Sequence, residues 1–134
     1  MNNKKILLTC LILAAVIASI GMVVAESNIN IPDGYKLDDS LSVVNQTTKF
    51  FDVDCTYNRV VMVNGDKNIT VDTFLPEKEI TLTPSGGSVM KNISDTPCLY
   101  QEKDGRFIFV YSNNNQFVQI DAPDEKVIAE VISK

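Results

Sequence analysis

A chain of 134 residues with a formal net charge of −5 is long enough for one domain with a single hydrophobic core. It contains no histidine, which excludes Ser-His-Asp and Cys-His catalytic machinery and removes the commonest protein ligand of zinc. The acidic balance disfavours nucleic-acid binding, because acidic side chains repel the phosphate backbone. These totals predict one domain that needs no cofactor.

The chain begins with a hydrophobic leader over residues 1–25, in which two lysines precede an uncharged run over residues 6–25. Twenty residues of helix extend about 30 Å, enough to span a bilayer, so an uncleaved leader would contact the membrane as a transmembrane anchor. The basic end should stay cytoplasmic, so that residues 26–134 are exported. Cys10 lies inside the hydrophobic run, where we interpret it as an apolar residue rather than a lipid attachment site.

The end of the leader also fits a signal-peptidase site. Val23 and Ala25 occupy the −3 and −1 positions, with cleavage before Glu26. We expect a cleaved signal peptide in preference to a signal anchor. The domain is then secreted, or, if the leader is kept, anchored on the outer face of the cytoplasmic membrane.

The next elements predict strands and one hairpin. Residues 28–37 turn at Pro-Asp-Gly, and residues 38–48 are weakly patterned, which predicts a loop or a short helical turn. Residues 49–57 alternate, with Phe51, Val53 and Cys55 on one face and Asp52 and Asp54 on the other. Residues 59–74 predict a hairpin with Asn-Gly at its turn.

The second half of the chain predicts a meander and a helix. Residues 76–84 favour an extended stretch, and the Ser-Gly-Gly-Ser sequence at 85–88 predicts a flexible loop. Three strands follow between residues 98 and 122, and their aromatic stripe (Phe107, Phe109 and Tyr111) is more typical of a core than of a carbohydrate platform. The final segment predicts a helix with Pro123 at its first position and an apolar stripe of Val127, Ile128, Val131 and Ile132.

Together these elements predict an α+β fold. We expect an antiparallel sheet, made of a hairpin and a three-strand meander, that the C-terminal helix covers on one face. The hydrophobic leader helix precedes this single domain.

Cys55 and Cys98 are the only cysteines of the exported part. An even pair in an oxidising compartment predicts a disulfide, and the chain-entropy model gives about 4 kcal/mol for a loop of this length. The alternative, a redox-active pair, usually has its cysteines close in sequence. We therefore expect a structural disulfide bond.

Two further kinds of site are candidates. Three sequons, at Asn45, Asn68 and Asn92, are candidates for N-glycosylation of an exported glycoprotein. Asp52 and Asp54 share one strand face, where paired carboxylates could bind Ca²⁺ or act as an acid/base couple. Because no loop glycine and no downstream bidentate Glu accompany them, we interpret this pair as a solvated strand surface and expect no metal site.

Three stretches carry a family resemblance. The "IPDGY" start, the "DGRFIFVYSNNNQFVQIDAPD" meander and the closing helix are similar to small uncharacterised exported α+β proteins of methanogenic archaea. The resemblance covers most of residues 28–134, and its motifs are turns and strands rather than catalytic groups. The resemblance implies a location in the envelope or outside the cell, where N-glycosylation can occur. It implies no activity and no catalytic residue.

We therefore expect a non-catalytic exported domain that binds or presents a cell-surface protein or glycan. One alternative is a carboxylate-based hydrolase acting on glycans, which would need a cleft with two carboxylates about 5–10 Å apart. Another is an adhesin-like structural module, for which an exposed apolar patch or an open sheet edge would be the sign. The residues do not define the ligand or the oligomeric state.

Overall fold

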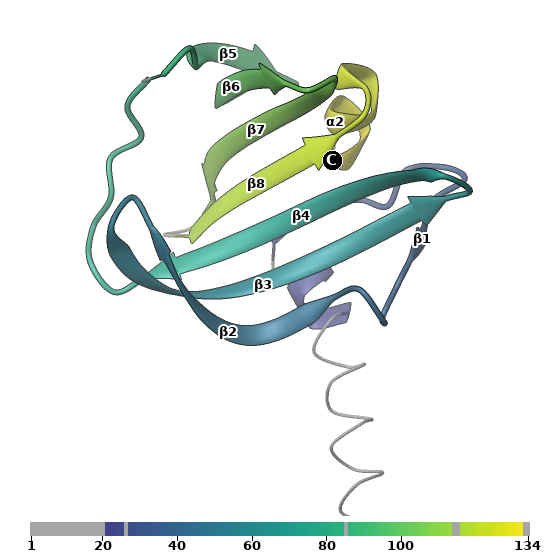
Figure 1. Cartoon of the computed structure of the whole chain (residues 1–134), viewed down its shortest axis with the longest axis horizontal. Coiled ribbons are helices and arrows are strands. Elements are labelled where there is room, and N and C mark those ends of the chain that lie inside the picture. The colour runs from purple at the N-terminus through teal and green to yellow at the C-terminus, as the bar shows by residue number, and fades with distance from the viewer. Residues whose placement is uncertain (1–20, 26, 85, 114–115, 133–134) are drawn as a thin grey trace, which may run out of the picture.

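A computed structural model gives the architecture of the chain and describes residues 21–25, 27–84, 86–113 and 116–132 (Figure 1). A helical segment at residues 21–25 comes first. It is followed by β1 (Lys36–Leu37), β2 (Val43–Phe50), β3 (Val53–Asn64), β4 (Lys67–Pro76), β5 (Val89–Ile93), β6 (Thr96–Lys103), β7 (Arg106–Asn113), β8 (Gln116–Ala122) and the helix α2 (Glu125–Ile132).

All strands form one antiparallel sheet in the order β1-β3-β4-β8-β7-β6-β5. Strand β3 is long enough to hold two partners on the same edge, so β1 pairs with its end and β2 pairs with its start. The last strand, β8, lies between β4 and β7. It therefore joins the N-terminal strands to the β5–β8 meander.

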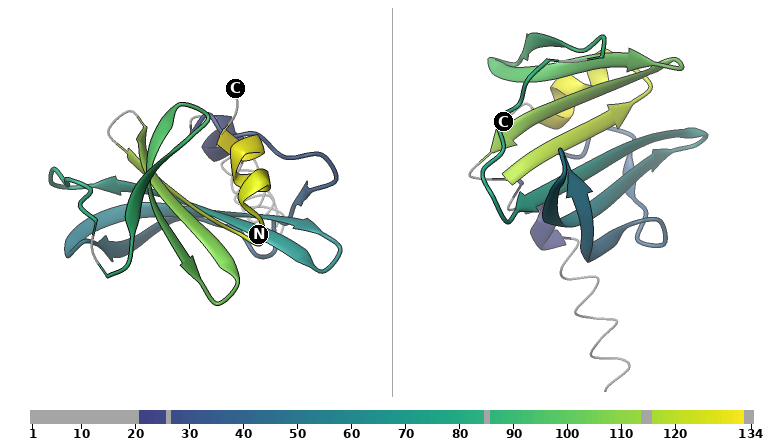
Figure 2. Two further views of the ribbon diagram at one scale, coloured as in Figure 1. Left: turned by 90° about the horizontal axis from the view of Figure 1, so that it is seen from above. Right: turned by 60° about the vertical axis from the view of Figure 1, so that its left-hand side comes forward.

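The sheet is strongly bent around the C-terminal helix. Helix α2 contacts both β8 and β5, although β7 and β6 lie between these two strands in the sheet. Figures 1 and 2 show the consequence, with β5 to β7 carried out of the plane of β3 and β4 and α2 beside β8. An ion pair between Lys91 of β5 and Glu125 of α2 adds to this contact.

The main hydrophobic core fills the face of the sheet that α2 covers. We call it the first cluster, and its fully buried members come from β3, β4, β6, β7, β8 and α2: Val60, Met62, Ile69, Val71, Cys98, Phe109, Val118, Ile120, Ala122, Ile128 and Val131. The alternation of inward apolar residues on adjacent strands places these side chains on one face. The stability of the domain therefore rests on this face.

The structure confirms the predicted antiparallel sheet with a C-terminal helix. It also confirms the apolar stripe of α2, because Ile128, Val131 and Ile132 are buried and Val127 packs against the first cluster. The helix starts later than expected, since Asp124 caps it by accepting a hydrogen bond of 2.8 Å from the backbone N–H of Lys126. Pro123 therefore lies outside the helix.

The β3–β4 hairpin and the β6–β7–β8 meander also match their predictions, with two differences elsewhere. The two loop residues of the first hairpin are Gly65 and Asp66 rather than Asn64 and Gly65. The loop or helical turn expected over residues 38–48 is wrong from Val43 onward, because these residues form β2. This strand is held by backbone pairing with β3, so most of its side chains remain exposed and give no alternating pattern.

Candidate functional site

The second face of the sheet carries a smaller hydrophobic cluster. We call it the second cluster, and its buried members come from six strands: Phe50, Cys55, Phe74, Leu99, Val110 and Phe117. The phenylalanine rings pack closely, with centroids of Phe50 and Phe74 4.4 Å apart. Its cover comes from Ile80 and Leu82 of the segment between β4 and β5, and no residue of α2 packs on it. This face is therefore only partly closed.

A hollow of about 180 Å³ opens beside the second cluster, and we call it the open-face hollow. It brings together three parts of the chain: the turn between β2 and β3, the residue just before β5, and the strands β6, β7 and β8. Its lining residues are Phe51, Ser88, Leu99, Tyr100, Gln101, Ile108, Val110 and Gln119. The sheet register supports this assembly, since Gln101 lies opposite Ile108 and Val110 lies opposite Gln119.

Phe51 has an unusual backbone for an aromatic residue. It forms the β2–β3 turn with Asp52, and both residues have positive φ, +50° for Phe51 and +62° for Asp52. Such turns favour asparagine, aspartate and glycine, because other L-residues lose roughly 1–2 kcal/mol in the left-handed region. The side chain is nevertheless 48% exposed at the rim of the hollow. Strained residues of this kind are concentrated in ligand-binding and active sites, which directs attention to Phe51.

The walls of the open-face hollow are apolar or neutral. They include no aspartate, glutamate, lysine or arginine, and their polar groups include the amides of Gln101 and Gln119. The two arginines of the sheet, Arg59 on β3 and Arg106 on β7, do not line the hollow and bind carboxylates elsewhere. Arg59 donates two hydrogen bonds to Asp72, at 2.8 and 3.1 Å, and Arg106 donates to Asp121 at 2.5 Å. The groups that the hollow offers to a ligand are therefore uncharged, and they include the ring of Phe51 and the amides of Gln101 and Gln119.

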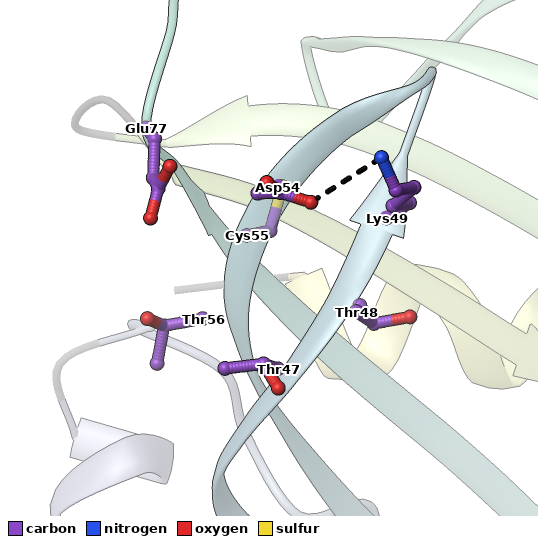
Figure 3. Close-up of a pocket in the computed structure, with 7 residues that line it drawn as sticks. All are labelled: Thr47, Thr48, Lys49, Asp54, Cys55, Thr56 and Glu77. Atoms are coloured by element: carbon purple, nitrogen blue, oxygen red, sulfur yellow. Dashed lines mark ion pairs between the residues drawn. The ribbon is translucent and has the colours of Figure 1, made fainter.

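A second hollow, of about 380 Å³, lies along β2 and β3 and is shown in Figure 3. Its walls are the side chains of Thr47, Thr48, Lys49, Asp54, Cys55, Thr56 and Glu77. Most of them are exposed, and the Lys49–Asp54 ion pair at 3.5 Å is open to solvent on both sides. An ion pair of this kind contributes about 0–1 kcal/mol. Although this hollow is larger, it is the solvated surface of a hairpin.

The candidate carboxylates do not converge on one point. Asp52 lies in the β2–β3 turn rather than on the strand, whereas Asp54 lies on β3 and pairs with Lys49. Glu77 approaches Asp54 only through its backbone N–H, which donates to the Asp54 carbonyl at 2.9 Å. Within the described part of the chain, no group of three Cys, Asp or Glu side chains could hold a metal ion.

The two cysteines are both buried and both free in the structure, and they belong to different hydrophobic clusters. Burial raises the pKa of the Cys98 thiol to about 11. Burial, together with the charges of Asp54 and Glu77, also raises the pKa of Cys55. Both groups are therefore protonated at neutral pH and are poor nucleophiles. The Cys55–Cys98 disulfide is not formed here and stays a prediction, which a non-reducing peptide map would test.

All three sequon asparagines are exposed. Asn68 lies near the start of β4, whereas Asn45 and Asn92 lie on β2 and β5, the strands at the two edges of the sheet. Asn45 also has a positive φ of +55° at the irregular point of the β2–β3 pairing. N-glycosylation at these positions stays a prediction.

Most of the leader, residues 1–20, lies outside the described residues. Among the helices that the structure does describe, none has the length and apolar character needed to cross a membrane. Comparison of the chain with protein-family models, with curated proteins and with solved structures finds no match.

Sequence reasoning missed the open-face hollow. Gln101 and Gln119 are ordinary strand residues until the sheet order brings β6 and β8 to the same place. Phe51 was placed on a strand because the Phe-Asp pair contains neither glycine nor asparagine, the usual markers of a two-residue turn. One signal was available in the sequence, because two adjacent apolar residues, Phe50 and Phe51, interrupt the alternation of apolar and polar residues.

Proposed function

We propose that this protein is a non-catalytic exported domain, of the cell envelope or secreted, that binds one sugar residue of a surface glycan in the open-face hollow. The observation that carries the proposal is Phe51. The fold keeps an exposed aromatic ring in a strained turn at the rim of a hollow, where a glycine or asparagine would suit the backbone better.

The chemistry of the walls favours a neutral, partly apolar ring. The C–H face of a sugar can stack on the ring of Phe51, and the amides of Gln101 and Gln119 can both donate and accept hydrogen bonds with its hydroxyls. A charged ligand would find no opposite charge on these walls. The volume of about 180 Å³ is below the roughly 300–1,000 Å³ of sites for drug-sized ligands, which favours a single ring.

The hydrolase alternative has less support. Glycan hydrolysis needs two carboxylates across a cleft, one of which acts as a general acid. The carboxylate that is most buried among the described residues, Asp72, is bound by both nitrogens of the Arg59 fork and lies outside both hollows. Asp54 and Glu77 border the larger hollow, but both are exposed.

One observation favours the adhesin-like alternative. Strand β5 ends the sheet and exposes Val89 and Met90, so that its free edge could accept a strand from a partner protein. If the protein self-associates or binds peptides, and Met90→Pro abolishes that association, the result would support this second candidate.

Titration of the purified protein with a panel of neutral oligosaccharides, followed by NMR or calorimetry, tests the proposal. We expect binding that Phe51→Asn reduces at least about tenfold, corresponding to about 1.4 kcal/mol. Asparagine tolerates the left-handed turn, so the variant should stay folded. Leu75→Asn is the matched control, since Leu75 is similarly exposed on β4 (56%, against 48% for Phe51) but lies outside the hollow. Binding that Phe51→Asn leaves unchanged, or no binding across the panel, would refute the proposal.

A further inference from the structure

The end of the leader is part of the folded domain. We infer that the peptide bond between Ala25 and Glu26 stays intact, so that the hydrophobic leader remains attached and holds the domain at a lipid bilayer. This inference departs from the expectation of a cleaved signal peptide, and it holds whatever ligand the open-face hollow takes.

The first observation is a complete helix C-cap across the expected cleavage site. The backbone N–H of Ile29 donates to the carbonyl of Val24 at 3.3 Å, and that of Asn28 donates to the carbonyl of Ala25 at 3.2 Å. Asn28 has a φ of +56°. These two hydrogen bonds around a left-handed residue are the Schellman motif, in which Asn28 is the residue just past the helix end.

The hydrophobic contact that accompanies this motif is present as well. Val24 and Ile29 occupy the two positions that commonly touch in a Schellman cap, and both pack in the first cluster. The cap is therefore continuous with the core of the domain. A further hydrogen bond of 2.9 Å, from the N–H of Asn30 to the carbonyl of Val131, ties the segment to α2.

The second observation is the burial of Val23. Its side chain is only 8% exposed in the first cluster, whereas the preceding residue, Met22, is 57% exposed. One side of the helical segment at residues 21–25 therefore packs against the first cluster, and the other side is exposed to solvent. Val23 is also the residue at the −3 position of the expected signal-peptidase site. The side chain that the peptidase would have to bind is therefore buried in the first cluster.

These contacts protect the bond only after the domain has folded, and from then on they make the chain a poor substrate. Cleavage of folded proteins is concentrated in exposed loop tips, and the bond after Ala25 lies within a turn that three backbone hydrogen bonds span. The third of these joins the N–H of Ser27 to the carbonyl of Val23 at 2.9 Å. Cleavage before folding would remove Val23 and Val24 from the core.

The lipid bilayer is the partner that fits the sequence before this segment. Seventeen uncharged residues run from Ile6 to Met22, which reaches the lower end of the roughly 17–25 residues that span a membrane. Lys4 and Lys5 can extend this reach by placing their ammonium groups at the cytoplasmic interface. The exposed side chain of Met22 then marks the border between the bilayer and the domain.

The test uses the full chain expressed in cells that export it. We expect the protein in the membrane fraction after an alkaline wash, with an intact mass that includes the leader. A protein whose first residue is Glu26 would overturn the inference.

A pair of variants tests the packing separately in the full chain, in detergent. Val23→Ser should lower the melting temperature by about 5 °C or more, because it removes a buried apolar side chain. Met22→Ser is the matched control and should shift it by less than about 2 °C. Equal shifts for the two variants would show that residues 21–25 do not belong to the folded domain.

Discussion

The strained turn at Phe51 predicts an inverted order of stability for two substitutions. At a strand position, a glycine usually lowers the stability of the protein by roughly 0.5–1 kcal/mol relative to an alanine, because glycine loses more backbone freedom on folding. At a φ of +50° the order of the two variants should reverse, because the left-handed backbone conformation is strained for alanine and unstrained for glycine. We expect Phe51→Gly to be more stable than Phe51→Ala by about 1 kcal/mol, or about 4 °C in melting temperature.

Both variants remove the same aromatic ring, so the comparison isolates the backbone. Urea denaturation followed by circular dichroism gives the free energy of unfolding of each variant. The same two substitutions at Leu75, an exposed residue of β4 without positive φ, serve as the control and should give the usual order. If Phe51→Ala equals or exceeds Phe51→Gly in stability, the turn is not strained and the argument for a functional role of Phe51 fails.

Three other predictions follow from the packing and the charges. Ile128→Ala should lower the free energy of unfolding by about 2–5 kcal/mol in urea denaturation, because the side chain is fully buried in the first cluster; a loss below about 1 kcal/mol would contradict this. Arg59→Ala leaves the buried Asp72, which is 5% exposed, without its partner and should lower the free energy of unfolding by about 1–3 kcal/mol. Lys49→Ala breaks an exposed ion pair and should lower it by less than about 1 kcal/mol. Similar losses of stability for the two variants would refute this contrast. In reduced protein the pKa of Cys98 is raised from 9.0 to about 11, so the unfolded chain releases its proton first and stability should fall as the pH rises through this window. Cys98→Ala should show a smaller fall between about pH 9 and about pH 11, and an unchanged slope would argue against a buried thiol.

The central elements of the fold were predictable because burial and turn chemistry agree there. The β3–β4 hairpin and the β7 strand carry alternating apolar residues, and α2 carries an apolar stripe with an acidic first turn. In each of these elements the apolar residues of the pattern lie on the face that is buried in the first cluster. Local preference and long-range packing give the same answer at these positions.

The edge strands were less predictable for a physical reason. β2 and β5 are held largely by backbone hydrogen bonds to one neighbour, and four of the five residues of β5 are exposed. A strand of this kind needs no hydrophobic alternation, so residues such as Gln46 or Asn92 carry no sign of it. The open-face hollow depends on the turn after β2, on Ser88 just before β5 and on the order of the sheet, which no local pattern contains.

The hydrogen bond between Asn30 and Val131 joins the start of the domain to its last helix. Helix α2 follows all the strands in the chain, so the ribosome makes it after them, and the first cluster lacks Ile128 and Val131 until then. Contacts between such distant residues form slowly, because closing the long loop between them costs conformational entropy. The core is therefore incomplete while the strands are being synthesised. A chain in that state can pass through a translocation channel as an extended polypeptide and complete its fold on the far side, which suits the export proposed for it.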